Sequence, residues 1–220
     1  MPRIARATAG GLCYHVLNRG NGRARVFHKD KDYQAFIDLI AEANDRLPMR
    51  VLGYCLMPNH FHLMVRPFAD GELSTWMQWL MTSHVRRYHA HYHSSGHVWQ
   101  GRFKSFIVQK DEHFLTAIRY IERNALRAGL VERAEDWRFG SLYWCTAGRR
   151  LGLLTDWPVQ RPRRWREMVN RPQGEAELEA LRLCVKRGRP YGDDRWVKRV
   201  AKRHDLETTL RPLGRPKGRS

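Results

Sequence analysis

The sequence predicts an α+β fold in which helices cover an antiparallel four-stranded sheet. Three observations lead to this class. Four segments have strand-like composition, longer segments of helical periodicity separate them, and a Met-Pro-Asn turn joins the two middle strands. The order strand–helix–strand–strand–helix–strand–helix is that of the split βαβ, or ferredoxin-like, plan. We therefore expect helices on one face of the sheet.

The first strand is expected over residues 12–20, where β-branched and aromatic residues run into a loop rich in glycine and asparagine. Apolar residues then recur at helical spacing, which predicts a helix over residues 31–47 with Asp30 or Asp32 as its N-cap. The second strand is expected over residues 49–57. The third strand begins at His60, runs antiparallel to the second, and stops before a proline.

The second helix is predicted over residues 71–93, which carry an apolar stripe at helical spacing. Residues 96–109 read as a loop that leads into the fourth strand. Asp111 is a suitable N-cap for a third helix, which Gly129 would end. A short aromatic segment over residues 136–144 predicts a final helix.

The composition changes near residue 148, after which arginine, proline and glycine become frequent. We expect residues 1–148 to form the main domain. Residues 149–220 are expected to be a basic Arg/Pro-rich extension, partly helical, with a flexible tip.

The charge balance points to a polyanionic partner. Lys and Arg number 40 against 22 Asp and Glu, a formal net charge of +18. Solubility does not require so one-sided a surface, and nucleic acid is the commonest polyanion that proteins bind. There is no membrane-spanning apolar run or secretory signal, and the four cysteines have no metal-binding or disulfide spacing. We therefore expect a cytoplasmic, nucleoid-associated protein.

His60 and His62 alternate with Phe61, Leu63 and Val65 in the third strand. Residues two apart in a strand point the same way, so the two imidazoles share one face and the apolar residues share the other. Two imidazoles at this spacing can hold one metal ion. The alternative is a pair of surface histidines.

The third helix has a polar face distinct from its apolar face. Tyr120 and Asn124 are separated by four residues and therefore stack along the helix, and Arg127 lies nearby. Either this face carries chemistry, or Tyr120 is an ordinary boundary tyrosine and Arg127 serves a salt bridge or the helix C-terminus.

Four segments occur in a distinctive order over about residues 10–145: YHVLNRGN, LMPNHFHLMV, GHVWQGRFKSFIV and AIRYIERNALRAGLV. Together they resemble the signatures of single-tyrosine HUH transposases, the IS200-like family, and in particular its REP-associated tyrosine transposases. HUH stands for histidine, hydrophobic residue, histidine. Family members often have N-P-V-R-A where this chain has NALRA, and the absent proline is expected to make the helix more regular.

The resemblance implies a catalytic domain over residues 1–148 in which Tyr120 is the nucleophile and His60, His62 and Asn124 bind Mg²⁺ or Mn²⁺. The implied activity is a metal-dependent endonuclease and strand transferase for single-stranded DNA. Its substrates would be hairpin-forming repeated extragenic palindromes, cleaved through a 5′-phosphotyrosine intermediate. The alternatives are a non-catalytic DNA- or RNA-binding regulator and a metal-dependent nuclease that uses water. A monomer is expected, although the insertion-sequence relatives are dimers that exchange helices.

Several basic and amide side chains are candidates for DNA contact. Two follow the first strand, two lie beside Trp99 and Phe103, one is on the third helix, and three belong to Gly-Arg-Pro segments suited to a minor groove. The alternatives are that the aromatic residues are core and that the tail binds DNA only non-specifically. The candidates are Asn18, Arg19, Arg102, Lys104, Arg127, Arg187, Arg189 and Arg215.

Overall fold

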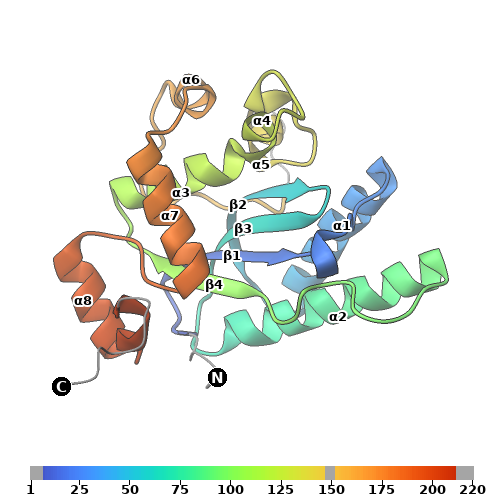
Figure 1. Ribbon diagram of the computed structural model, residues 1–220, viewed down its shortest axis with the longest axis horizontal. Coiled ribbons are helices and arrows are strands. Elements are labelled where there is room, and N and C mark those ends of the chain that lie inside the picture. Colours follow the sequence, from blue (N-terminus) through green and yellow to red (C-terminus); the bar gives the residue numbers. More distant parts are fainter. Residues whose placement is uncertain (1–6, 147–151, 212–220) are drawn as a thin grey trace, which may run out of the picture.

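The computed structural model describes residues 7–146 and 152–211. Its centre is one antiparallel sheet with the strand order β2-β3-β1-β4 (Figure 1). The predicted four-stranded sheet is therefore confirmed, with strands β1 (Cys13–Arg19), β2 (Arg50–Met57), β3 (His60–Arg66) and β4 (Lys104–Val108).

Helices α1 (Asp30–Arg46) and α2 (Glu72–Tyr92) cover one face of the sheet. The apolar residues of β3 that alternate with the histidines pack into this core, as predicted. The N-cap of α1 is Lys29 rather than either predicted aspartate. Asp32 acts from within the first turn, where a carboxylate oxygen accepts hydrogen bonds from the backbone N–H groups of His28 and Lys29.

Helix α3 (Glu112–Glu122) covers the opposite face, so the expectation of helices on one face holds only for α1 and α2. The second face of the sheet is itself largely apolar. It presents Cys55, Met64 and Phe106 to α3, and such a surface is stable only when it is covered.

The third helix is less regular than expected. It is interrupted at Arg123, which has φ −81° and ψ −5°, and continues as α4 (Asn124–Arg127). Gly129 ends it with a φ of +68°, and the N–H of Leu130 donates to the carbonyl of Ala125, which completes the C-terminal motif.

The rest of the chain packs around α3 and the β4 edge of the sheet. Trp165 and Leu181 join the core beneath α3, while Val200 joins the core on the opposite face. The N–H of Tyr191 donates to the carbonyl of Ile107, 2.8 Å away, beside β4. The elements involved are α5 (Ser141–Thr146), α6 (Trp165–Asn170), α7 (Glu175–Arg187) and α8 (Asp194–Arg203), with short 3-10 turns at Asn21–Arg23, Ala134–Asp136 and Glu207–Leu210.

The expected flexible tip lies outside the described residues. Within the described ranges, none of the helices has the length and apolar character needed to cross a membrane.

Candidate active site

The two histidines of the H-x-H segment lie on the face of the sheet that α3 covers. Their ring centroids are 5.0 Å apart. β3 is a central strand, so His62 pairs with Leu17 of β1 on one side and with Cys55 of β2 on the other. His62 is only 3% exposed, and His60 lies at the end of the strand and is partly exposed.

A third histidine, His15 of β1, completes this cluster, and sequence reasoning missed it. Its Nε2 atom lies 2.8 Å from the Nδ1 atom of His62, and its side chain is fully buried. His15 pairs with Met64 across the ladder, so its contact with His62 is a diagonal one. Because side chains alternate along β1, His15 lies on the opposite face of the sheet from Tyr14 and Val16. Knowledge that β1 pairs with β3 would have identified His15 as a neighbour of His62.

The proton on His60 is assigned by its neighbour. The Nδ1 atom of His60 lies 2.7 Å from the Oδ1 atom of Asn59, and the amide nitrogen of Asn59 donates to the carbonyl of Arg23. Since this second bond fixes the orientation of the amide, His60 donates from Nδ1. The Nε2 lone pair of His60 is then left to accept a proton or bind a metal.

The imidazoles of this cluster are neutral at pH 7. Burial, assisted by Arg19 and Arg127, lowers the pKa of His60 to about 4. Burial likewise lowers the pKa of His15 to about 3 and that of His62 well below its usual value. Neutral imidazole is the form that binds metals.

Tyr120 of α3 faces the histidines. The centroid of its ring is 5.8 Å from that of His62 and 6.0 Å from that of His15. The side chain is 7% exposed, so the tyrosine is at the edge of the buried cluster rather than on the open surface. The structure therefore brings Tyr120 and His62, two of the candidate site residues, close together.

Arg127 connects Tyr120 to Asn124. Its guanidinium carbon lies 4.2 Å from the centroid of the Tyr120 ring, and its Nη2 atom donates to the Oδ1 atom of Asn124 over 2.9 Å. Asn124 is 3% exposed, and its Nδ2 atom has no partner among the described residues. Arg127 thus holds the amide oxygen while leaving that oxygen a second lone pair.

These donors fit a divalent cation. The candidate ligands are two neutral imidazoles, His60 and His62, and the amide oxygen of Asn124, which Arg127 links to the Tyr120 ring that contacts His62. The set carries no negative charge, so a bound cation would keep its charge for an anionic substrate.

Another group of potential metal ligands lies at the start of α3, where Asp111, Glu112 and His113 approach one another. Asp111 is engaged as the N-cap, accepting from the N–H and the Nδ1 atom of His113, both at 2.9 Å. Tyr120 lies nine positions after Asp111 along the helix, a rise of about 14 Å. This group therefore lies apart from the tyrosine.

The candidate DNA contacts near β1 differ in exposure, because Asn18 is buried and Arg19 is exposed. Asn18 is buried, and its amide donates to the carbonyl of Gly101 and accepts from the N–H of Arg19. Arg19 is exposed at the end of β1, opposite His60 in the ladder. The neighbouring aromatics, Trp99 and Phe103, are buried in the core.

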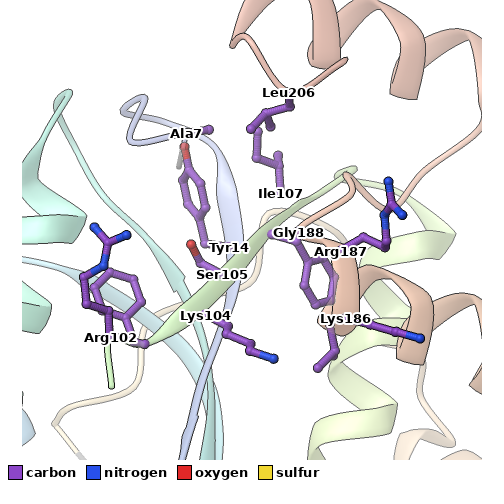
Figure 2. A pocket seen from close by; sticks show the side chains of 13 residues that line it. Ala7, Tyr14, Arg102, Lys104, Ser105, Ile107, Lys186, Arg187, Gly188 and Leu206 are labelled. Carbon is purple, nitrogen blue, oxygen red and sulfur yellow. The ribbon is translucent and has the colours of Figure 1, made fainter. Parts of the chain in front are cut away.

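The remaining candidates lie near the β4 edge of the sheet. Arg102, Lys104 and Arg187 line one cavity (Figure 2). Arg187 also donates to the carbonyls of three residues near the end of the described chain, Thr208, Thr209 and Arg211. Arg189 lies 3.8 Å from Asp194, and Arg215 is outside the described residues.

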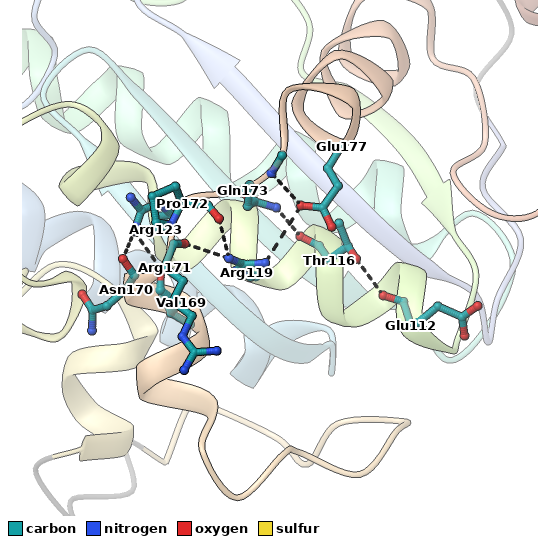
Figure 3. A network of polar contacts seen from close by, with 11 residues as sticks. Glu112, Thr116, Arg119, Arg123, Val169, Asn170, Arg171, Pro172, Gln173 and Glu177 are labelled. Atoms are coloured by element: carbon teal, nitrogen blue, oxygen red, sulfur yellow. Dashed lines mark hydrogen bonds and ion pairs between the residues drawn. The ribbon is translucent and has the colours of Figure 1, made fainter.

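Helix α3 is fixed in place by arginines that bind backbone carbonyls of the same chain (Figure 3). Arg119 donates to the carbonyls of Arg171 and Pro172 over 2.7 and 3.0 Å. Arg123 donates to those of Val169 and Asn170 over 3.0 and 2.6 Å.

A buried carboxylate adds to this attachment. Glu122 accepts hydrogen bonds from Ser141 and from the indole N–H of Trp165, both over 2.7 Å. Burial raises the pKa of Glu122. The segment 165–172 thus positions the helix that carries Tyr120, a role that sequence reasoning did not assign.

The sequence profile of the family described as "Transposase IS200 like" matches residues 8–124. A protein of Haemophilus influenzae named "Putative REP-associated tyrosine transposase" is 26% identical over 110 residues, which are 45% of this chain and 62% of that protein. The chain therefore spans less than two thirds of this relative.

Two solved structures are similar. A REP-associated tyrosine transposase bound to a REP hairpin superimposes with a TM-score of 0.55 and 21% identity, over 73% of this chain and 93% of the other. This likeness supports the fold. A protein of Deinococcus radiodurans described as a "putative transposase" has a TM-score of 0.40 and 18% identity, over 56% of this chain and 97% of the other.

Proposed function

Because the chain belongs to the family of IS200-like transposases, we propose that it cleaves and rejoins single-stranded DNA with the help of a divalent cation. Tyr120 is the proposed nucleophile, and His60, His62 and Asn124 are the proposed metal ligands. The observation that carries the proposal is the meeting of Tyr120 with the neutral H-x-H pair on one face of the sheet.

The reaction that suits these groups is a transesterification. The phenolic oxygen of Tyr120 forms a bond to a DNA phosphorus atom, and the bond from phosphorus to the 3′-oxygen breaks. The tyrosine gives up its proton and the departing 3′-oxygen gains one. The product is a 5′-phosphotyrosine with a free 3′-OH, and attack by another 3′-OH reverses the step and joins two strands.

When bound, Mg²⁺ or Mn²⁺ supplies positive charge that polarises a non-bridging phosphate oxygen. The chain's own residues then hold the reacting atoms. Asn59 orients the imidazole of His60, and Arg127 orients the amide of Asn124 while packing on the Tyr120 ring. Such positioning is a large part of catalysis in reactions of this kind.

We propose hairpin-forming repeated extragenic palindromes as the substrates, acted on at the chromosome. Two observations support this assignment. One similar solved structure is that of a REP-associated tyrosine transposase bound to a REP hairpin, and the formal charge of +18 on this chain suits a DNA partner.

We further propose that the active site is complete in one chain and that the protein acts as a monomer. The support is the attachment of α3 to the chain's own segment 165–172 through Arg119, Glu122 and Arg123. A helix held in this way would have to break several hydrogen bonds, including the buried one between Trp165 and Glu122, to move to a partner.

Strand transfer tests the proposal. Wild-type protein is incubated with Mn²⁺, a labelled hairpin from the palindromic repeats of the source genome, and a second oligonucleotide with a free 3′-OH. We expect a joined product without ATP, and its loss in Tyr120→Phe. The control Tyr143→Phe alters a partly exposed tyrosine of α5 and is expected to retain the product. Cleaved but never joined DNA would contradict the proposal.

A further inference from the structure

A cavity of about 420 Å³ lies at the β4 edge of the sheet, between β4 and the C-terminal end of α7 (Figure 2). This volume lies in the range of small-ligand sites. The apolar part of its lining includes Ile107, Val185 and Leu206. None of the roles proposed above uses the cavity as a binding site.

Part of the cavity wall is an unpaired strand edge. The carbonyl of Ile107 accepts from Tyr191, so the backbone groups of Ile107 point away from β1. In an antiparallel strand, the backbone N–H and C=O groups of every second residue point to the same side. The N–H and C=O of Ser105 therefore also point away from β1. Among the residues that the structure describes, none bonds to these two outward groups. Gly188, with a φ of +70°, ends α7 beside this edge, where a Cβ would lie in ordinary contact with the Ser105 carbonyl, 3.8 Å away.

Three cations surround the same cavity. Figure 2 shows Lys104 of β4, Lys186 of α7 and Arg102 before β4. All three are exposed, and within the described ranges none has a carboxylate at ion-pair distance. Such unneutralised charge favours an anionic ligand.

The cavity also adjoins the candidate active site. Phe106 lines the cavity, and its ring centroid lies 4.9 Å from that of His15, which contacts His62. Only strand β1 separates β4 from the H-x-H strand β3, a span of about 10 Å from β3 to β4. One flexible strand of DNA can therefore reach both places.

We propose that this cavity binds one unpaired nucleotide of the DNA strand that enters the active site. The base packs against Ile107 and Val185, and its edge bonds to the outward N–H and C=O of Ser105. The adjoining phosphates lie against Lys104 and Lys186. A base with neighbouring donor and acceptor atoms matches such a backbone edge, and a stacked or packed base with a phosphate contact is the usual form of single-strand recognition. The inference rests on the proposed function only for the identity of the strand.

The test uses binding rather than cleavage. In a Tyr120→Phe background with Mn²⁺, the affinity is measured for a repeat hairpin with short unpaired flanks, and then with an abasic site at each flank position in turn. We expect one position at which base removal weakens binding about tenfold. Val185→Trp fills the cavity and should weaken binding to intact DNA by a similar factor, with no further loss at that abasic position.

Leu183→Trp is the matched control, because Leu183 lies on the same helix, is 40% exposed and does not line the cavity. It should keep both the wild-type affinity and the abasic effect. The proposal would be overturned if Val185→Trp and the abasic site each lowered the DNA affinity independently of the other. It would also be overturned if the cavity bound an extended peptide tightly instead of the nucleotide.

A second variant tests the phosphate contact. Lys186→Gln should reduce the slope of log affinity against log salt by about 1, and an unchanged slope would count against the contact. A parallel adduct assay with intact Tyr120 separates the two proposals. If an adduct forms but the effects of Val185→Trp and of the abasic site are independent, only the nucleotide pocket is overturned. If the two effects depend on each other but no adduct forms, the pocket is supported and the proposed transesterification is overturned.

Discussion

The Nε2 atom of His15 lies 2.8 Å from the Nδ1 atom of His62, and both imidazoles are neutral. Only one of these two nitrogens can carry the shared proton. If the Nε2 atom of His62 is to bind a metal, its Nδ1 must donate and His15 must accept. His15 then carries its own proton on Nδ1, which has no partner in the described part of the chain. Metal binding therefore selects the tautomers of both residues.

Replacing His15 should weaken metal binding. His15→Phe removes the acceptor for His62 and is expected to lower the Mn²⁺ affinity about 10- to 100-fold, as for other partners of metal-bound imidazoles. His15→Gln retains an acceptor and should lose less. Isothermal titration calorimetry measures both. His84→Phe is the control, because His84 is also buried with an unpartnered Nδ1 but lies in the α1–α2 core. Wild-type affinity in His15→Phe would contradict this account.

Arg127 should matter through its geometry as well as its charge. Arg127→Lys keeps the charge but loses the planar group that bonds Asn124 and packs on Tyr120. We expect adduct formation in a single turnover to slow by about tenfold or more at saturating Mn²⁺. Arg138→Lys is the control, since Arg138 is exposed and forms an ion pair with the exposed Asp30. An equal rate in Arg127→Lys and wild type would show that charge alone suffices.

Acid should destabilise the protein partly through His84. Burial lowers the pKa of His84 to about 4, while its unfolded value is about 6.5. Between these values the unfolded chain binds more protons, so stability falls as the pH drops from 6.5 towards 4. From pH 7 to pH 5 this histidine costs about 2 kcal/mol.

Urea unfolding of wild type and His84→Phe at both pH values measures this contribution. We expect the loss between pH 7 and pH 5 to be about 2 kcal/mol smaller in the variant. The same loss in both proteins would show that His84 can be protonated in the folded state without cost.

Trp165→Phe should destabilise the attachment of α3. The change leaves one oxygen of the buried Glu122 carboxylate without its indole donor. An unpaired buried group of this kind costs about 1–3 kcal/mol, measured as the free energy of unfolding in urea. Trp79→Phe serves as the control, because Trp79 is partly exposed and packs beneath Arg46. Faster amide exchange in α3 should accompany the loss, and an unchanged α3 would argue against the attachment.

The sheet could be predicted because strand alternation and the Met-Pro-Asn turn are local features. The same alternation placed His60 and His62 on one face. The position of α3 on the second face could not be read from element order, since it depends on which strands become central and buried on both sides. His15 was missed because its role depends on a diagonal contact between strands. Arg119, Arg123 and Glu122 were missed because their partners lie far along the chain, in segment 141–172.

The most direct test of the central claim is a search for a covalent protein–DNA adduct. Labelled hairpins from the palindromic repeats of the source genome are incubated with the protein and Mn²⁺ or Mg²⁺, and SDS-resistant adducts are mapped by mass spectrometry. We predict DNA attached to Tyr120, with the adduct lost in Tyr120→Phe and in His62→Ala. Cleavage without an adduct would mean that water attacks the phosphate, and tight binding without cleavage would indicate a DNA-binding regulator. Either result would contradict the account.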